Sequence, residues 1–352
     1  MTSAGSWSTG IKSHPRGWFF CLFGALCLAA CSNEQPVVQL AGVTMATTWH
    51  VTYIEPAKIV TQSALQQGIE QQLALVDRSM STYREDSEIS RFNAIAPNSW
   101  ATVSQSFYSV LSAALLVGKA SGGAYDVTVA PLVDLWGFGP GPAIDAPPTE
   151  SSITQLLEQV GQDNIRLNED SSQVMKFVGL SLDFSSLAKG YAVDQVAYWL
   201  ADQGISRFLV EVGGEMRMSG MSGRGDPWRV AIEQPESTGR SVATTIGLTD
   251  VSVATSGDYR NYFEVDGKRY SHSIDPRTGY PVAHDLVSVT VVHSSAMLAD
   301  AWATALTVLG AEQAMAVAQA EALAVYFIRS AGEDFVHSHT PAFAEYLAET
   351  QH

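Results

Sequence analysis

The stretch from Leu182 to Asp194, LDFSSLAKGYAVD, contains a change of sequence period. Its first residues alternate between apolar and polar, as expected of a β-strand. The residues that follow favour a helix that opens near Ser186 to Ala188. A lysine beside free N–H groups at a helix start is typical of an anion-binding site. An ordinary strand-to-helix connection with an exposed Lys189 explains the same pattern equally well.

Strands and helices follow each other irregularly on both sides of this stretch. Because there is no strict βαβ alternation, the pattern favours an α+β fold with mixed sheets and packed helices over a doubly wound sheet. A proline-rich segment at 139–148 predicts a surface loop and the best internal break. We expect strands at 48–54, 208–212, 228–232, 242–246, 262–265, 286–292 and 322–328, and helices at 64–80, from a Ser104 cap to Gly122, from a cap at Ser151 or Ser152, and at 297–309.

The first 30 residues read as a signal peptide, with basic residues before an apolar run that is too short for a comfortable membrane span. The run ends in Leu-Ala-Ala-Cys, so Cys31 resembles the lipidated cysteine of bacterial lipoproteins. An ordinary signal peptide followed by an incidental cysteine is the alternative. We therefore expect a lipoprotein signal peptide at 1–30, a lipidated cysteine and tether at 31–41, and a folded domain at 42–350.

The composition narrows the classes of function. The chain has 352 residues, of which 46% are hydrophobic, so it can bury a large core. Its formal net charge of −16 disfavours nucleic acid as a partner, and an anionic ligand needs a local basic patch or a metal ion. All three cysteines lie within the first 31 residues, which excludes a disulfide or a thiolate site from the folded domain.

Two short segments contain residues suited to metal binding and proton transfer. In LADAWATAL (298–306), Asp300 and Thr304 are four residues apart and share one helix face. Their hard oxygens suit Mg²⁺, although a helix cap and an internal hydroxyl bond would use the same residues. In SHSIDPRTGYP (271–281), a Pro-Gly turn can orient His272 as a base near neutral pH. A purely structural histidine is the alternative there.

Glycines and aromatic residues supply weaker signals. Gly213-Gly214 and Ser256-Gly257 each follow an expected strand, where glycine lets a ligand or another backbone approach closely. Tyr83 and Tyr125 can stack on a flat ring or can simply belong to the core.

Taken together, these segments resemble the ApbE family, the FAD:protein FMN transferases, over roughly residues 42–310. The resemblance implies an ApbE-like fold with the flavin site between two lobes. The segments that carry it are STYREDSEISRFN (81–93), AYDVTVAPLVDLWGFG (124–139), AKGYAVD (188–194), SGDYRNYF (256–263), HSIDPRTGYP (272–281) and ADAWATAL (299–306).

The resemblance implies a role for each site residue. Asp300, Thr304 and the carbonyl of Ala188 are expected to hold Mg²⁺, and His272 is expected to be the catalytic base. The residues expected to bind FAD are Met45, Tyr83, Ala124, Tyr125, Asp126, Asp183, Lys189, Glu215, Ser256 and Gly257.

Three departures from the family pattern bear on ligand affinity. Ala46 follows Met45 at a position where the family usually has glycine. Ser185 and Ser186 replace two glycines of the family pattern. Glu211 and Glu215 replace the usual asparagine and aspartate around Gly213-Gly214. We expect these changes to narrow the approach of the backbone to the ligand and to alter the local charge.

The implied reaction is Mg²⁺-dependent transfer of FMN from FAD to a threonine or serine hydroxyl of a target protein, with a phosphoester formed and AMP released. Implied acceptors are subunits of RNF complexes and of sodium-pumping NADH:quinone oxidoreductases. One alternative is an Mg²⁺-dependent FAD pyrophosphatase, and another is a periplasmic FAD-binding lipoprotein without turnover. We expect a membrane-anchored bacterial lipoprotein that faces the periplasm, with the choice of inner or outer membrane left open.

Overall fold

The structure, a computed structural model, describes residues 36–348 except 55–59, 140, 142, 143, 236–240, 258–261, 266, 267 and 333. The described residues belong to one compact unit that spans Gln35–His352. Cys31, the signal-peptide segment and part of the SGDYRNYF run lie outside the described residues. The first strand starts at Val37, so the folded part begins before the boundary expected at residue 42.

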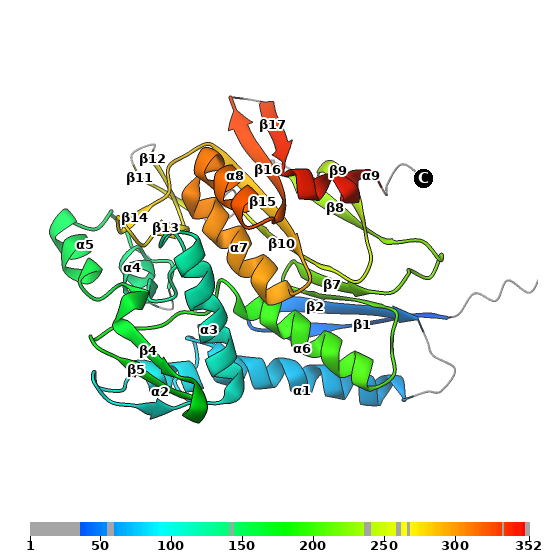
Figure 1. Cartoon of the computed structure of the whole chain (residues 1–352), viewed down its shortest axis with the longest axis horizontal. Coiled ribbons are helices and arrows are strands. Elements are labelled where there is room, and N and C mark those ends of the chain that lie inside the picture. Colours follow the sequence, from blue (N-terminus) through cyan, green and yellow to red (C-terminus); the bar gives the residue numbers. More distant parts are fainter. Residues whose placement is uncertain are drawn as a thin grey trace, which may run out of the picture. The chain divides into compact units, whose positions relative to one another are not determined.

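An eight-stranded sheet forms the centre of the described part of the chain (Figure 1). Each pair of neighbouring strands in it is antiparallel. In spatial order the strands are β1 (Val37–Thr44), β2 (Thr47–Ile54), β6 (Phe208–Val212), β7 (Glu215–Ser219), β10 (Ser252–Ser256), β15 (Leu286–His293), β16 (Ala324–Ala331) and β17 (Asp334–His339).

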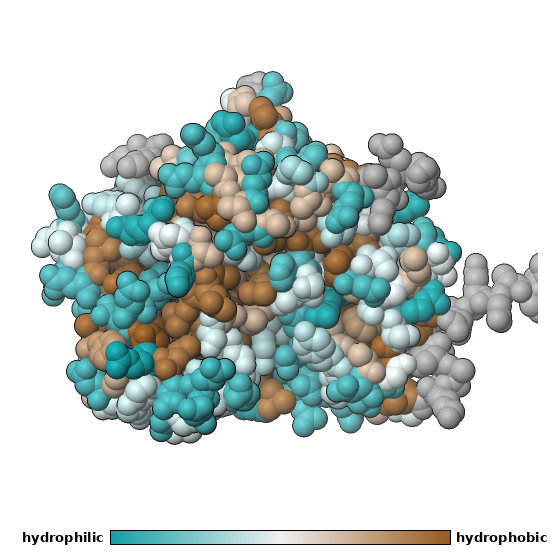
Figure 2. All heavy atoms as spheres, in the orientation of Figure 1, coloured by the Kyte–Doolittle hydropathy of each residue, from teal (hydrophilic) through white to brown (hydrophobic). Residues whose placement is uncertain are grey.

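Long helices pack on one face of this sheet (Figure 1). Helix α7 (Ala296–Leu309) contacts β10 and β15, and α6 (Ala188–Asp202) contacts β6 and β7. Helix α1 (Gln62–Met80) lies against α6, while α3 (Gln105–Ala120) and α8 (Ala311–Ala320) contact α7. Figure 2 shows hydrophilic side chains over much of the outer surface on this side, with apolar atoms between them.

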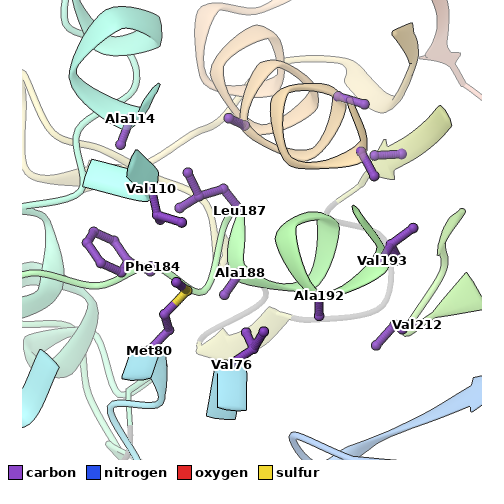
Figure 3. Close-up of a cluster of buried hydrophobic side chains, with 14 of the residues drawn as sticks. Val76, Met80, Val110, Ala114, Phe184, Leu187, Ala188, Ala192, Val193 and Val212 are labelled. Carbon is purple, nitrogen blue, oxygen red and sulfur yellow. The ribbon is translucent and has the colours of Figure 1, made fainter. Parts of the chain in front are cut away.

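The residues that lead into α6 pack into the core under these helices. Phe184, Leu187 and Ala188 point into it, as Figure 3 shows, and all three are buried. They meet apolar side chains of α1, α3 and α6, including Val76, Met80, Val110, Ala114 and Ala192. Burial of this cluster fixes the start of α6 inside the molecule, so residues next to that start are held rigidly.

The opposite face of the sheet and the region beyond α3 hold smaller clusters. Strands β8 (Trp228–Gln234) and β9 (Ser241–Leu248) share one with α9 (Ala344–Ala348) and the outward-facing side chains of the sheet. Another joins α4 (Ala130–Leu135) and α5 (Glu150–Leu157) to the short hairpin of β13 (Ile274–Asp275) and β14 (Tyr280–Pro281). The remaining α-helix and strands of the described residues are α2 (Glu88–Asn93), β3 (Ala101–Thr102), β4 (Ile165–Asn168), β5 (Gln173–Lys176), β11 (Tyr262–Val265) and β12 (Lys268–Ser271).

The expected α+β class is confirmed, as are the Ser104 cap and the start of α6 at Ala188. The apolar-polar alternation that begins at Leu182 does not form a strand: Leu182 bonds the side chain of Asn93, and the Asp183 N–H donates to the carbonyl of Val127. The apolar residues Leu182 and Phe184 are buried, but the segment does not pair with a neighbouring strand. The N-cap of α5 is Thr149, two residues before Ser151 and three before Ser152.

No helix among the described residues is long and apolar enough to cross a bilayer.

Candidate functional site

A pocket of about 770 Å³ lies where α6 and α7 meet the ends of several strands and loops. Most of the expected site residues line it, although they come from distant parts of the sequence. They are Tyr83, Ala124, Tyr125, Asp126, Asp183, Lys189, Glu215, Ser256, Gly257, His272, Asp300 and Thr304. Met45 and Ala188 are the expected residues within the described ranges that do not belong to this lining.

The contact between α6 and α7 places the charged residues of the pocket. A side chain at Gly190 would lie 2.2 Å from the carbonyl oxygen of Ala296, so only glycine lets the two helices approach this closely. The N–H of Gly190 donates a hydrogen bond to Asp300 Oδ2 at 3.1 Å. Lys189 and Asp300 therefore face each other across the helix contact, directly after buried Ala188.

Three charged groups share this wall of the pocket. Lys189 Nζ lies 2.6 Å from Glu215 Oε1 and 3.8 Å from Asp300 Oδ2. Burial of the ammonium opposes its charge, but the Asp300 and Glu215 carboxylates outweigh that effect and raise the pKa of Lys189. Burial raises the pKa of Glu215 to about 8 even though Lys189 pulls it down. Burial likewise raises the pKa of Asp300. Lys189 is thus the local counter-charge for both acids.

The donor set on this wall fits a divalent cation. Asp300 does not cap α7, because Ser295 is the N-cap. Asp300 and Thr304 therefore both lie inside the helix, one turn apart, and both line the pocket. The second carboxylate oxygen of Glu215 is buried and has no hydrogen-bond partner among the described residues. Such an unpaired oxygen favours positive charge nearby, and hard oxygens suit Mg²⁺.

The acidic lining agrees with this fit. Within the described part of the pocket, four acidic side chains (Asp126, Asp183, Glu215 and Asp300) accompany one lysine. No group of three or more His, Cys, Asp or Glu residues among the described residues could hold a metal. The expected Mg²⁺ site differs from such a group, because it uses one carboxylate, one hydroxyl and one backbone carbonyl.

Tyrosines form part of the remaining lining. Tyr125 is 2% exposed, and its hydroxyl accepts a hydrogen bond from Ser186 Oγ at 2.9 Å. Burial raises the pKa of Tyr125, so the hydroxyl stays neutral. Tyr83 is 72% exposed and lies at the rim. Ser186, one of the two serines in place of family glycines, thus bonds the buried Tyr125 hydroxyl at the pocket wall, whereas the exposed ring of Tyr83 can stack on a ligand.

Two further aspartates of the lining are engaged by their own loops. Asp126 accepts hydrogen bonds from the N–H and hydroxyl of Thr128 and from the N–H of Gln162, at 2.7–2.9 Å. Asp183 accepts one from the N–H of Ser185 at 2.7 Å. Burial raises the pKa of both Asp126 and Asp183. These contacts hold the loops that shape the pocket.

His272 lies on another side of the pocket, in the link between β12 and β13, just before the hairpin of β13 and β14. Trp136 Nε1 donates a hydrogen bond to the carbonyl of Gly279 at 2.8 Å, which ties the turn of that hairpin to the end of α4. Gly279 has a φ of +78°, and its N–H bonds the carbonyl of Asp275. The Arg277 guanidinium donates two hydrogen bonds to the Asp275 carboxylate, and the Arg277 N–H donates a third. These bonds and the Trp136 bond hold the hairpin turn that follows His272.

The ring of Phe138 meets the His272 ring edge-on, with 6.3 Å between centroids. The end of α4 sets the place of Phe138: Gly137 has a φ of +73°, and the Phe138 N–H bonds the carbonyl of Val133 at 3.0 Å. Neither Trp136 nor Phe138 was singled out from the sequence. The glycine that ends α4 directly before Phe138 was the available signal.

Met45 lies outside the pocket lining, half-buried against the main core. Met45 and Ala46 form the two-residue turn between β1 and β2, with φ of 43° and 57°. Two left-handed residues in a hairpin turn define type I′, which favours glycine at Ala46. The next residue, Thr47, lies 3.1 Å from the position of a Cβ on Gly213, so the turn borders the pocket at Gly213.

The sequence pattern of the ApbE family matches residues 45–327 of the chain. A protein named FAD:protein FMN transferase from Haemophilus influenzae is 44% identical over 333 residues, which cover 93% of this chain and 96% of the relative. One of the same name from Vibrio cholerae is 42% identical over 334 residues, covering 95% of this chain and 100% of the relative.

Solved structures are similar as well. The flavin transferase ApbE from Vibrio cholerae superposes with a TM-score of 0.83 at 41% identity, covering 89% of this chain and 100% of that one. The apo form of the flavinyl transferase ApbE from Pseudomonas stutzeri gives a TM-score of 0.82 at 38% identity, with 89% and 97% covered.

Proposed function

The chain belongs to the ApbE family, and from that membership and the chemistry of the pocket we propose that it transfers FMN from FAD to a hydroxyl group of a target protein. The observation that supports the proposal is that one pocket is lined both by Asp300 and Thr304, whose oxygens suit a cation, and by His272, which precedes a braced hairpin turn. Phosphoryl-type transfer needs both a positive field and a base.

Asp300 and Thr304 on α7, with the carbonyl of Ala188, would hold Mg²⁺. When bound there, the ion neutralises charge on the FAD pyrophosphate and stabilises the leaving AMP. Lys189, held by Glu215 at 2.6 Å, keeps a positive charge beside the same phosphates. Tyr125 and Tyr83 line the same pocket, and the exposed ring of Tyr83 offers an aromatic face to a flat ring of FAD. These residues bind and orient FAD.

His272 removes the proton from the acceptor hydroxyl. The hydroxyl oxygen attacks the FMN-side phosphorus, the bond from that phosphorus to the oxygen bridging to AMP breaks, and AMP leaves. A threonine or serine hydroxyl is a weak nucleophile at neutral pH, and a positioned base typically contributes about 10²–10⁴-fold. Phe138 against the imidazole limits the orientations that the ring can take.

The acceptor and the location are part of the proposal. The acceptor class that the family resemblance implies is a membrane redox subunit with a flavin-bearing threonine or serine, as in RNF and sodium-pumping NADH:quinone oxidoreductases. Cys31 would carry a lipid anchor that holds the enzyme at the membrane, facing the periplasm. This part rests on the Leu-Ala-Ala-Cys run, which lies outside the described residues. Loss of the lipid mass in Cys31→Ser checks it.

AMP release tests the reaction. The full-length chain is incubated with FAD and Mg²⁺, with an acceptor domain or with the same domain carrying a Thr→Val change at its flavin site. We expect AMP release only with the intact acceptor. AMP and free FMN formed at equal rates with both acceptors would instead identify an FAD pyrophosphatase, and bound FAD without AMP in either tube would identify a binding protein.

A further inference from the structure

A buried aspartate outside the pocket joins the two helices of the charged wall. Asp194 lies on α6 and is 3% exposed. Its carboxylate accepts hydrogen bonds from Ser295 Oγ at 2.7 Å and from the N–H groups of Ala296 and Met297 at 3.1 Å each. First-turn N–H groups have no partner within their own helix. Asp194 therefore caps α7 from the neighbouring helix.

A cation on the sheet compensates the charge of this carboxylate. Arg217 on β7 forms an ion pair with Asp194 Oδ1, and its guanidinium lies 4.7 Å from the centre of the Tyr198 ring. The positive end of the α7 dipole adds to that compensation. The ion pair and the cap together connect β7, α6 and α7 at one buried point.

The contact of Asp194 with α7 lies about one helical turn from the contact between Gly190 and Asp300. Gly190 lies four residues before Asp194 on α6, and Asp300 lies four residues after Ala296 on α7. Each interval is about one helical turn. The two helices are thus joined at consecutive turns, by Asp194 to the first turn of α7 and by Gly190 to Asp300. A shift of the first turn would carry Asp300 and Thr304 with it.

We propose that Asp194 is a positioning residue for Asp300: it fixes the start of α7 against α6 and thereby sets the geometry of the cation-binding wall. Asp194 itself does not line the pocket. The effect on Mg²⁺ binding rests on the proposed function. The effect on the position of Asp300 rests only on the contact between α6 and α7.

Hydrogen exchange of the full-length chain without metal tests the helix contact. In Asp194→Asn, an amide replaces one acceptor oxygen by a donor that faces the N–H groups of α7. We expect faster exchange in peptides that cover Gly190 and the first turn of α7. Val196→Ala is the control, because it trims a fully buried side chain of the same helix and keeps the Asp194 carboxylate. Equal exchange in wild type and Asp194→Asn would overturn the inference.

Calorimetric titration with MgCl₂ tests the consequence for the pocket. Residues that orient metal ligands typically contribute about 10–100-fold to metal affinity. We expect Asp194→Asn to bind Mg²⁺ about tenfold more weakly, and Val196→Ala to bind it like wild type. If both variants bind Mg²⁺ equally weakly, the loss of affinity comes from lower stability alone. That result would contradict a positioning role for Asp194. A wild type that binds no Mg²⁺ would contradict the proposed function. The hydrogen-exchange result would still show whether Asp194 holds the helix contact that positions Asp300.

Ser295→Ala covers the case in which Asp194→Asn does not fold. It removes one arm of the same contact, the hydroxyl that donates to Asp194 and accepts from the N–H of Leu298. The two backbone N–H bonds to Asp194 remain. We expect faster exchange in the first turn of α7 and a smaller loss of Mg²⁺ affinity. Wild-type values for both measurements would overturn the inference.

Discussion

The helix wall of the pocket, where α6 meets α7, differs in construction from the turn wall, where α4 braces the residues 271–281. The helix wall places charges: Lys189, Glu215 and Asp300 lie together and balance one another. The turn wall places a ring: the rings of His272 and Phe138 meet edge-on, and the hairpin turn that follows His272 accepts a hydrogen bond from the indole N–H of Trp136.

The difference in construction separates two tasks. Buried charges cost desolvation free energy, so removal of one partner leaves the others uncompensated. The helix wall is therefore sensitive to any loss of charge and suits the binding of a cation and a pyrophosphate. The turn wall depends on packing and on hydrogen bonds to the backbone, which suits a group that must exchange a proton in a fixed orientation. Changes in one wall should leave the task of the other intact.

The largest effect is expected on the turn wall. His272→Ala should lower the rate of FMN transfer by about 10²–10⁴-fold, because the acceptor hydroxyl loses its base. Mg²⁺ binding should stay at the wild-type level, since His272 belongs to the other wall. Transfer assays and MgCl₂ titrations measure the two quantities. Loss of Mg²⁺ binding in this variant would contradict the hypothesis that the two walls have independent tasks.

On the helix wall, Asp300→Ala should lower transfer by at least about 100-fold, because a direct ligand contributes more than the outer residues that orient it. Here the loss should appear in Mg²⁺ binding as well. Asp202→Ala, an exposed carboxylate at the end of α6, is the matched control. Transfer at the wild-type rate by Asp300→Ala at limiting Mg²⁺ would refute the metal assignment.

Trp136→Phe examines the brace of the turn. The variant keeps an aromatic ring but removes the N–H that bonds the carbonyl of Gly279. An unpaired buried acceptor costs about 1–3 kcal/mol, so the free energy of unfolding should fall by that amount. Transfer should also slow while Mg²⁺ binding is kept. Chemical denaturation gives the first quantity, and an unchanged free energy of unfolding would mean that the bond does not brace the turn.

The charged wall should give stability a pH dependence of definite sign. The pKa of Glu215 is raised from its ordinary 4.5 to about 8 in the folded chain. The folded state therefore binds this proton more tightly than the unfolded state. The associated stability is fully present below pH 4.5 and is lost as the pH rises through about 8. Denaturation of wild type and Glu215→Gln across this range should show the decline in wild type and a smaller decline in the variant.

The smallest effect is expected at the hairpin turn between β1 and β2. Ala46 has a φ of 57°, a left-handed conformation that costs a non-glycine residue about 1–2 kcal/mol. Ala46→Gly should therefore stabilise the chain by about 1 kcal/mol without a change in Mg²⁺ binding. Thermal unfolding measures it. A lower melting temperature would show that the turn does not carry this strain.

The sequence predicted where the candidate site residues lie in the fold better than it predicted the contacts between them. Asp300 and Thr304 share a helix face, as their spacing required, and His272 lies just before the turn that Pro276 and Gly279 marked. The closeness of Lys189 to Asp300 could not be predicted, because it depends on the approach of α6 and α7 at Gly190, which no local pattern records. The same holds for the bond from Trp136 to Gly279, between residues far apart in the chain.

Met45 is an expected FAD-binding residue that does not line the pocket. It lies in the hairpin turn against the main core, next to Thr47, which borders the pocket at Gly213. A turn residue cannot be assigned to one side of a strand pair from sequence alone, because its φ decides where the side chain points.

The intact mass of the acceptor tests the central claim most directly. An acceptor domain with a single candidate threonine is incubated with the full-length chain, FAD and Mg²⁺, in parallel with His272→Ala and Asp300→Ala. We predict that the acceptor gains the mass of one FMN phosphoester with wild type, in step with AMP release, and gains none within the same time with either variant. An acceptor of unchanged mass beside AMP and free FMN would contradict the transfer, and an adduct formed equally by all three proteins would contradict the site.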